Sequence, residues 1–166
     1  MNLWVFDLDG TLVTSNIDYH YALLDFCRLM LSTLGHKAPH FLKVLDLEGE
    51  IDKERFKTMR ADRNRFPGSL AEAYRELCRR AGVEFDPAIE RQVLEIGNSA
   101  LSEKTYQNRT MIPGVEELLA FLQDRGDLLY CVTFGDRWVQ WMKWRGTTCG
   151  AFSQPKGSFA RSGTKS

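Results

Sequence analysis

Two aspartates separated by a single residue, Asp7 and Asp9, form the sharpest chemical signal in the chain. They directly follow a short apolar run at residues 3–6 and precede Gly10, a residue type that lets the backbone turn tightly. The pattern predicts a buried strand with Asp7 at its carboxyl end, the edge of an open α/β sheet where ligands bind. Paired carboxylates there can act on one reacting centre, and an aspartate can serve as a nucleophile that forms an acyl-phosphate.

Two other interpretations of this segment stay open. One is an ordinary acidic turn, and the other is a calcium loop, because many such loops begin with the pattern DxDG. A loop of the EF-hand kind also needs an acidic or amide side chain at its fifth position and a glutamate at its twelfth. The chain has Thr11 and Asp18 at those positions, which disfavours calcium.

The elements that would position the aspartates follow from the apolar pattern. A second buried strand is predicted at residues 128–134, ending near Thr133 and Gly135. From about residue 16 to 105 the apolar residues have helical spacing, and a further helix begins after Pro113 and Gly114 and ends at Gly126. A strand, a long helical insert, a helix and a strand make a split βαβ unit, so we expect an α/β fold with a parallel sheet.

Local signals predict helix limits and buried faces. Residues 70–81 should form a helix opened by a capping box at Ser69 and closed by Gly82, and Asp86 should cap the next helix. Residues 136–145 should be helical, with a row of tryptophans packed on the sheet rather than forming a binding surface: Trp138, Trp141 and Trp144. The helix before Gly35 should bury one apolar face: Tyr21, Leu24, Cys27, Leu31 and Leu34.

The composition is that of a soluble globular protein. The 166 residues, 43% hydrophobic and 27% charged, suffice for about one domain. The 22 basic and 22 acidic residues cancel, so the total charge gives no reason to expect nucleic acid or an anionic membrane as a partner.

The four cysteines form no CxxC pair, which disfavours a zinc site or disulfide framework and favours a reducing cytosol. Acidic residues near the N-terminus and the lack of an 18-residue apolar run predict a cytoplasmic protein without a secretory signal or membrane span.

The charges are unevenly distributed along this balanced chain. Asp136 is the last acidic residue, and the charged residues after it are all basic: Arg137, Lys143, Arg145, Lys156, Arg161 and Lys165. Residues 147–166 are rich in Gly, Ser and Thr, so we expect an irregular basic tail with a weak strand candidate at residues 148–153. Scattered basic charges without an organised motif are weak evidence for nucleic-acid binding.

Residues 4–12, WVFDLDGTL, resemble the first motif of the haloacid dehalogenase-like (HAD) hydrolase superfamily. Residues 112–119, IPGVEELL, resemble the helix that usually precedes that family's second motif, an apolar strand ending in Thr or Ser that matches residues 129–133. The resemblance implies a Rossmann-like parallel sheet formed by residues 1–14 and 108–146. It also implies that residues 15–107 form a helical cap inserted after the first motif.

The resemblance also implies roles for individual residues. Asp7 would be the nucleophile and a ligand of Mg²⁺. Asp9 would protonate the leaving group and later activate water, while its backbone carbonyl binds the metal. Thr133 would hydrogen-bond the phosphoryl group, helped by backbone N–H groups around Leu8, Asp9 and Phe134. Because phosphoryl transfer needs mainly positioning and charge neutralisation, this set of groups suits it.

The third and fourth motifs of the family are not evident. Lys156 and Lys165 are the candidates for the third-motif lysine that offsets the charge of nucleophile and phosphate, and Lys143 is a weaker option. No acidic residue follows Asp136 to supply the fourth motif, and only two convincing strands are present. We therefore expect a member that is truncated or altered after about residue 146.

The expected function is a magnesium-dependent phosphatase that acts on a small phosphorylated metabolite through an aspartyl-phosphate at Asp7. Dehalogenase members of the family attack carbon and usually carry a non-acidic residue at the position of Asp9, so a phosphate substrate is favoured. The alternative is a catalytically impaired fragment or phosphate-binding module. The sequence does not indicate the oligomeric state.

Overall fold

The computed structural model describes residues 1–14, 17–107 and 110–145. The chain divides into two compact units, Met1–Ser15 with Glu103–Ser166, and Asn16–Ser102. We call them the strand unit and the helical unit. The tail, the strand candidate at residues 148–153, Lys156 and Lys165 lie outside the described residues.

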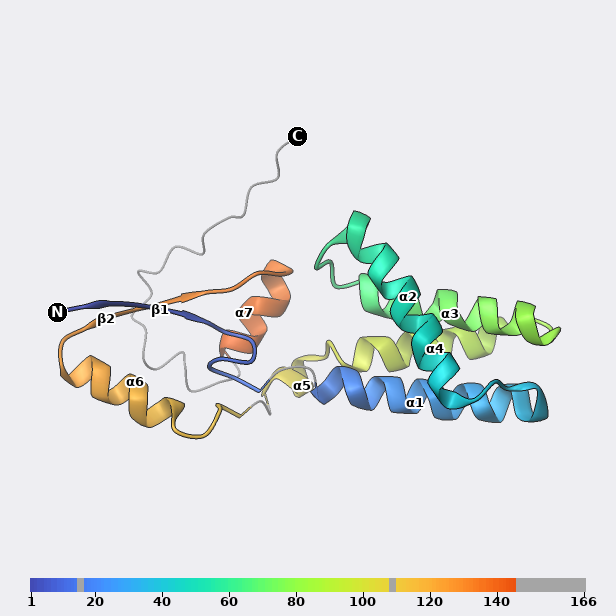
Figure 1. Cartoon of the computed structure of the whole chain (residues 1–166), viewed down its shortest axis with the longest axis horizontal. Coiled ribbons are helices and arrows are strands. Elements are labelled where there is room, and N and C mark those ends of the chain that lie inside the picture. The colour runs from blue at the N-terminus through green and yellow to red at the C-terminus, as the bar shows by residue number, and fades with distance from the viewer. Residues whose placement is uncertain (15–16, 108–109, 146–166) are drawn as a thin grey trace. The chain divides into compact units, whose positions relative to one another are not determined.

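The strand unit is built on a parallel pair of strands (Figure 1). Strand β1 spans Leu3–Asp7 and β2 spans Leu128–Val132, paired from Leu3 opposite Leu128 to Asp7 opposite Val132. Helix α6, Val115–Asp124, precedes β2 and supplies Val115 and Leu119 to a small core with Leu8 and Val13. Helices α5, Glu103–Gln107, and α7, Arg137–Arg145, are the other described helices of this unit. The α/β fold class with a parallel pair is thus confirmed.

The prediction that both strands are buried is wrong. The registered residues Leu3, Val5, Leu128, Tyr130 and Val132 are exposed, whereas Phe6, Leu129 and Cys131, on the opposite face, pack against the small core. Side chains alternate between the two faces of a strand, so an apolar run is buried on both faces only where both are covered. Among the described residues, the core that contains α6 covers one face of this pair.

Asp127 ties the two strands together at their amino ends. The backbone N–H of Asn2 donates to Asp127 Oδ1 at 2.7 Å, and the Trp4 indole N–H donates to Oδ2 at 3.1 Å. Arg125 also pairs with Oδ2, at 2.7 Å. These contacts, the Asn2 hydrogen bond foremost, hold the pKa of Asp127 below its ordinary value.

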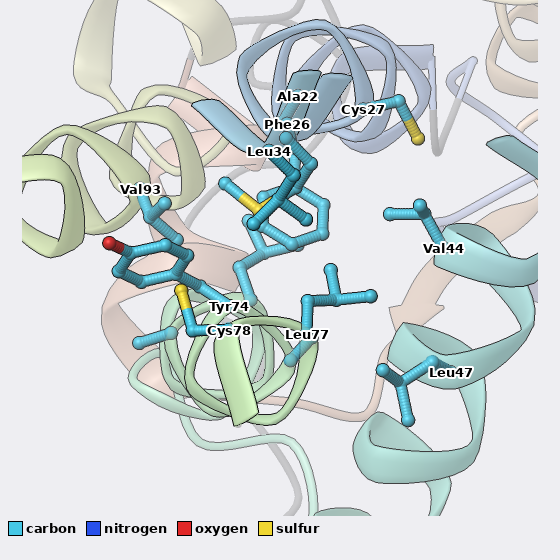
Figure 2. Close-up of a cluster of buried hydrophobic side chains, with 14 of the residues drawn as sticks. Ala22, Phe26, Cys27, Leu34, Val44, Leu47, Tyr74, Leu77, Cys78 and Val93 are labelled. Atoms are coloured by element: carbon cyan, nitrogen blue, oxygen red, sulfur yellow. The ribbon is translucent and has the colours of Figure 1, made fainter. Parts of the chain in front are cut away.

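The helical unit contains α1 (Ile17–Leu34), a 3₁₀ turn η1 (Gly35–Lys37), α2 (Phe41–Met59), α3 (Arg65–Ala81) and α4 (Pro87–Ser99). Its core joins side chains from all four α-helices, among them Phe26, Val44, Tyr74 and Val93 (Figure 2). No described helix is long and apolar enough to cross a membrane.

In this unit, the helix ends predicted from the sequence match the structure better than the predicted buried faces do. Gly82 caps α3 in the left-handed conformation, and the Asp86 side chain accepts a hydrogen bond from the Ala88 N–H at 2.7 Å. The capping box is wrong, because α3 begins at Arg65 and Ser69 lies inside it. Ser69 Oγ is instead 2.6 Å from a carboxylate oxygen of the buried Glu48, whose pKa is raised chiefly by burial.

The predicted buried face of α1 is also wrong. Cys27 and Leu34 are buried as predicted, but Tyr21, Leu24 and Leu31 are exposed. The remaining buried positions of α1 are Ala22, Phe26 and Met30. The face that packs against α3 and α4 is therefore rotated from the one that the sequence favoured.

Candidate active site

Asp7 ends strand β1, and Asp9 lies in the tight, hydrogen-bonded turn that follows. Asp7 is the last residue of β1 and is exposed. Beyond it, the backbone N–H groups of Leu12 and Val13 donate to the Leu8 carbonyl at 3.1 Å each. Gly10 has a φ of 74°, and Leu8 and Val13 are buried in the small core, so the turn holds Asp9 in place.

Helix α7 supplies the cation of this site. The Lys143 ammonium donates to both carboxylate oxygens of Asp9, at 2.9 Å to Oδ1 and 2.7 Å to Oδ2. The Lys143 side chain is 7% exposed and that of Asp9 27% exposed. A paired contact in this setting is stronger than a surface ion pair and fixes the orientation of the carboxylate.

Gln140 connects the second strand end to Asp9. The Thr133 hydroxyl donates to Gln140 Oε1 at 2.9 Å, and Gln140 Nε2 donates to the Phe134 carbonyl at 3.1 Å. The same nitrogen lies 3.5 Å from Asp9 Oδ2. Gly135 has a φ of 152°, and a Cβ there would come within 2.5 Å of Gln140 Nε2, so a glycine keeps room for this bridge.

The direction of α7 brings these residues inward. The Asp136 carboxylate caps the helix by accepting hydrogen bonds from the N–H groups of Trp138 and Val139, at 2.9 and 3.1 Å. The buried side chains of α7 are Val139, Gln140, Met142 and Lys143. The prediction that the tryptophan row forms the packed face is wrong for Trp138 and Trp141, which are 41% and 40% exposed.

The structure thus gathers most of the residues that the sequence singled out. The parallel register places Asp7 beside Val132, so that Asp9, Thr133 and Phe134 follow neighbouring strand ends. Lys143, the weakest candidate by sequence, contacts Asp9, whereas Lys156 and Lys165 lie outside the described residues. Gln140 was missed, and its only sequence signal is a position three residues before Lys143 on the same helix. The catalytic and binding roles of these residues stay predictions.

The described residues fit only part of a magnesium site. Asp7 offers a carboxylate and Asp9 a backbone carbonyl, whereas the Asp9 carboxylate is engaged by Lys143. Over residues 1–14, 17–107 and 110–145, no three His, Cys, Asp or Glu side chains gather closely enough to hold a metal ion. Magnesium commonly takes one or two carboxylates and completes its shell with water and substrate phosphate.

No family model matches the sequence, and no curated protein matches it. Among solved structures, a haloacid dehalogenase-like family hydrolase from Xanthomonas campestris superposes with a TM-score of 0.68 at 21% sequence identity. The match covers 92% of this chain and 58% of that one, so this chain spans less than two thirds of its length.

Two L-2-haloacid dehalogenases superpose less closely. One has a TM-score of 0.42 at 13% identity, covering 92% of this chain and 61% of its own. The other, from Xanthobacter autotrophicus, has a TM-score of 0.36 at 16% identity, covering 86% and 50%. Of the three superpositions, only the one with the Xanthomonas structure is close enough to assign a fold. The chain has the haloacid dehalogenase-like fold.

Proposed function

We propose that the strand unit carries a phosphate-monoester hydrolase site with Asp7 as its nucleophile. The observation that carries this proposal is the joining of the two strand ends: Asp9 follows β1, Thr133 follows β2, and Gln140 and Lys143 link them. Asp7 stands exposed at the same edge, where a substrate can approach it. Ligands of open α/β sheets bind at this edge.

The proposed chemistry has two displacement steps. A carboxylate oxygen of Asp7 attacks phosphorus and the bond to the alcohol oxygen breaks. For Asp9 to give that oxygen a proton, it must enter this step protonated, with one carboxyl oxygen released from Lys143. Water, deprotonated by Asp9, then attacks phosphorus, which restores the Asp7 carboxylate and releases inorganic phosphate. Lys143 would keep Asp9 oriented, and the Thr133 hydroxyl would turn from Gln140 towards the phosphoryl oxygens.

Magnesium belongs to this proposal as a cofactor. Asp7 and the Asp9 carbonyl would hold the ion, which would neutralise negative charge on the phosphoryl group. The proposed substrate is a small phosphorylated metabolite, because Asp9 supplies the leaving-group acid that a phosphate ester needs and that dehalogenases usually lack. A cytosolic location is proposed with it, in keeping with the free thiols of Cys27, Cys78 and Cys131.

A second candidate function is phosphate binding without turnover. It is favoured by one observation: the Asp9 carboxylate is already satisfied by Lys143, and the described residues offer no third acidic ligand for a metal. In this case the chain would bind inorganic phosphate but would not hydrolyse a phosphate ester.

Hydrolysis of p-nitrophenyl phosphate by the 166-residue chain separates the two candidates. With Mg²⁺ present, the phosphatase proposal predicts turnover that Asp7→Asn lowers by roughly 10³-fold or more, since the nucleophile is lost. Asp124→Asn, which changes an exposed aspartate at the end of α6, should leave the rate unchanged. Equal rates for the wild type and Asp7→Asn would rule out the mechanism. Calorimetric binding of inorganic phosphate without hydrolysis would favour the second candidate.

A further inference from the structure

Helix α1 has an apolar stripe on the face that points away from the core of its own unit. Ile17, Tyr21, Leu24 and Leu31 are 51%, 62%, 61% and 43% exposed. Their spacing of three, four and seven residues places them along one side of the helix. We call these four residues with Arg28, which lies on the same side and is exposed, the α1 stripe.

Folding of the helical unit does not account for this stripe. The opposite side of α1 already supplies Phe26, labelled in Figure 2, and Met30 to the core of the unit, and both are fully buried. Single exposed apolar residues are ordinary on protein surfaces, but four of them aligned on one side of a helix, with only Arg28 between them, are typical of an interaction surface. The stripe therefore calls for a partner outside the core of the helical unit.

The order of residues in the stripe makes it complementary to itself. Ile17 and Leu31 lie seven residues to either side of Leu24, and Tyr21 and Arg28 lie three residues before it and four after it. A two-fold axis at Leu24 would bring two copies of α1 together in antiparallel directions. Each Ile17 would then face Leu31 of the other copy. Each Tyr21 would lie one residue out of level with an Arg28 of the other copy, within reach of that long side chain.

The charge of Arg28 fits this pairing. An arginine that reaches the face of a tyrosine ring is attracted to it, and the attraction strengthens when the pair leaves water. A two-fold contact makes this pair twice, and it keeps each Arg28 away from the Arg28 of the other copy. We infer that a second copy of this chain docks antiparallel along the α1 stripe to form a homodimer.

Analytical ultracentrifugation of the whole chain tests the proposal. The wild type should sediment as a concentration-dependent dimer. Leu24→Lys should give a monomer, because the substitution places two ammonium groups together at the two-fold axis. Leu42→Lys changes another exposed leucine, on α2, which is 52% exposed against 61% for Leu24, and should leave the dimer intact. A monomeric wild type, including one in which the strand unit of the same chain covers the stripe, would overturn the inference.

Two substitutions at position 21 test the antiparallel pairing itself. Tyr21→Glu and Tyr21→Lys both remove the ring, but only glutamate can pair with Arg28 of the other copy. The dimer dissociation constant should be at least about 10-fold larger for Tyr21→Lys than for Tyr21→Glu. This ratio corresponds to a difference of about 1.4 kcal/mol in the free energy of dimerisation. Circular dichroism should show the same helix content in both variants. Equal dissociation constants for the two folded variants would contradict the pairing.

Discussion

At the scale of single residues, the Asp9 carboxylate is the most constrained group of the site. Two side chains that lie three positions apart on α7, Gln140 and Lys143, hold it. The ion pair with Lys143 is largely buried, and removal of one partner of such a pair is costly because the other charge stays behind uncompensated. Lys143 is therefore expected to stabilise the strand unit as well as to orient Asp9.

A double-mutant cycle measures this contribution. Lys143→Met should lower the free energy of unfolding by about 1–3 kcal/mol, less than for a fully buried pair because Asp9 is partly exposed. Asp9→Asn combined with Lys143→Met should cost less than the two single changes together, with a coupling free energy of about 1 kcal/mol or more. Lys104→Met, at an exposed lysine of α5, should change stability by no more than about 0.5 kcal/mol. Additive single effects in urea unfolding would contradict the pairing.

Residues of the site differed in how well the sequence predicted them. Asp7, Asp9 and Thr133 lie at strand ends, and a strand end can be located from the apolar run before it. Lys143 contacts a residue 134 positions away, so its contact with Asp9 depends on which turn of α7 meets the end of β1. No local pattern contains that information, and the same is true of Gln140.

At the scale of elements, the helical unit depends on a close crossing of α3 and α4. Gly97, buried on α4, lies against Pro67 of α3, and a Cβ at Gly97 would come within 2.6 Å of the Pro67 backbone. Gly49, on the exposed side of α2, has no neighbour within 4 Å of a Cβ. Although both glycines lie in helices, replacing them with a larger residue should therefore have opposite effects on stability.

Alanine substitution at each glycine tests this crossing. Gly97→Ala should lower the free energy of unfolding by about 1–3 kcal/mol, because the helices must move apart. Gly49→Ala should raise it by about 0.5–1 kcal/mol, because alanine loses less backbone entropy in a helix. Thermal unfolding followed by circular dichroism reports both changes. A stabilising Gly97→Ala would show that the crossing is looser than the structure indicates.

The elements also show why helix limits were easier to predict than helix faces. Gly82 acts through its own backbone, and Asp86 acts through a side-chain hydrogen bond to the Ala88 N–H two residues on, so both effects are local. The buried faces of α1 and α7 depend on which neighbours pack against them. In α1 the exposed Leu24 and Leu31 are as apolar as the buried Phe26 and Met30, so hydrophobic spacing alone could not separate the two sides.

At the scale of the whole molecule, the chain interrupts a parallel strand pair with a helical unit. Residues 3–7 pair with residues 128–132 across the whole insertion, and Asp127 closes the amino ends of the pair. Parallel strands need a crossover connection, usually a helix. Helix α6 directly precedes β2 and serves as that crossover, so the two strands can pair in parallel despite the long insertion after β1. The fold class could be predicted for this reason, whereas the exposed face of the strand pair could not be foreseen from two apolar runs.

Asp7, at the end of β1, is the proposed phosphoryl acceptor. The most direct measurement is mass spectrometry of the peptide that contains Asp7, after the chain has been mixed with p-nitrophenyl phosphate and Mg²⁺ and quenched with acid. We expect a phosphoryl adduct on Asp7 in the wild type and in Asp124→Asn, and none in Asp7→Asn. Turnover of the ester without an adduct on Asp7, or an adduct that persists in Asp7→Asn, would contradict it.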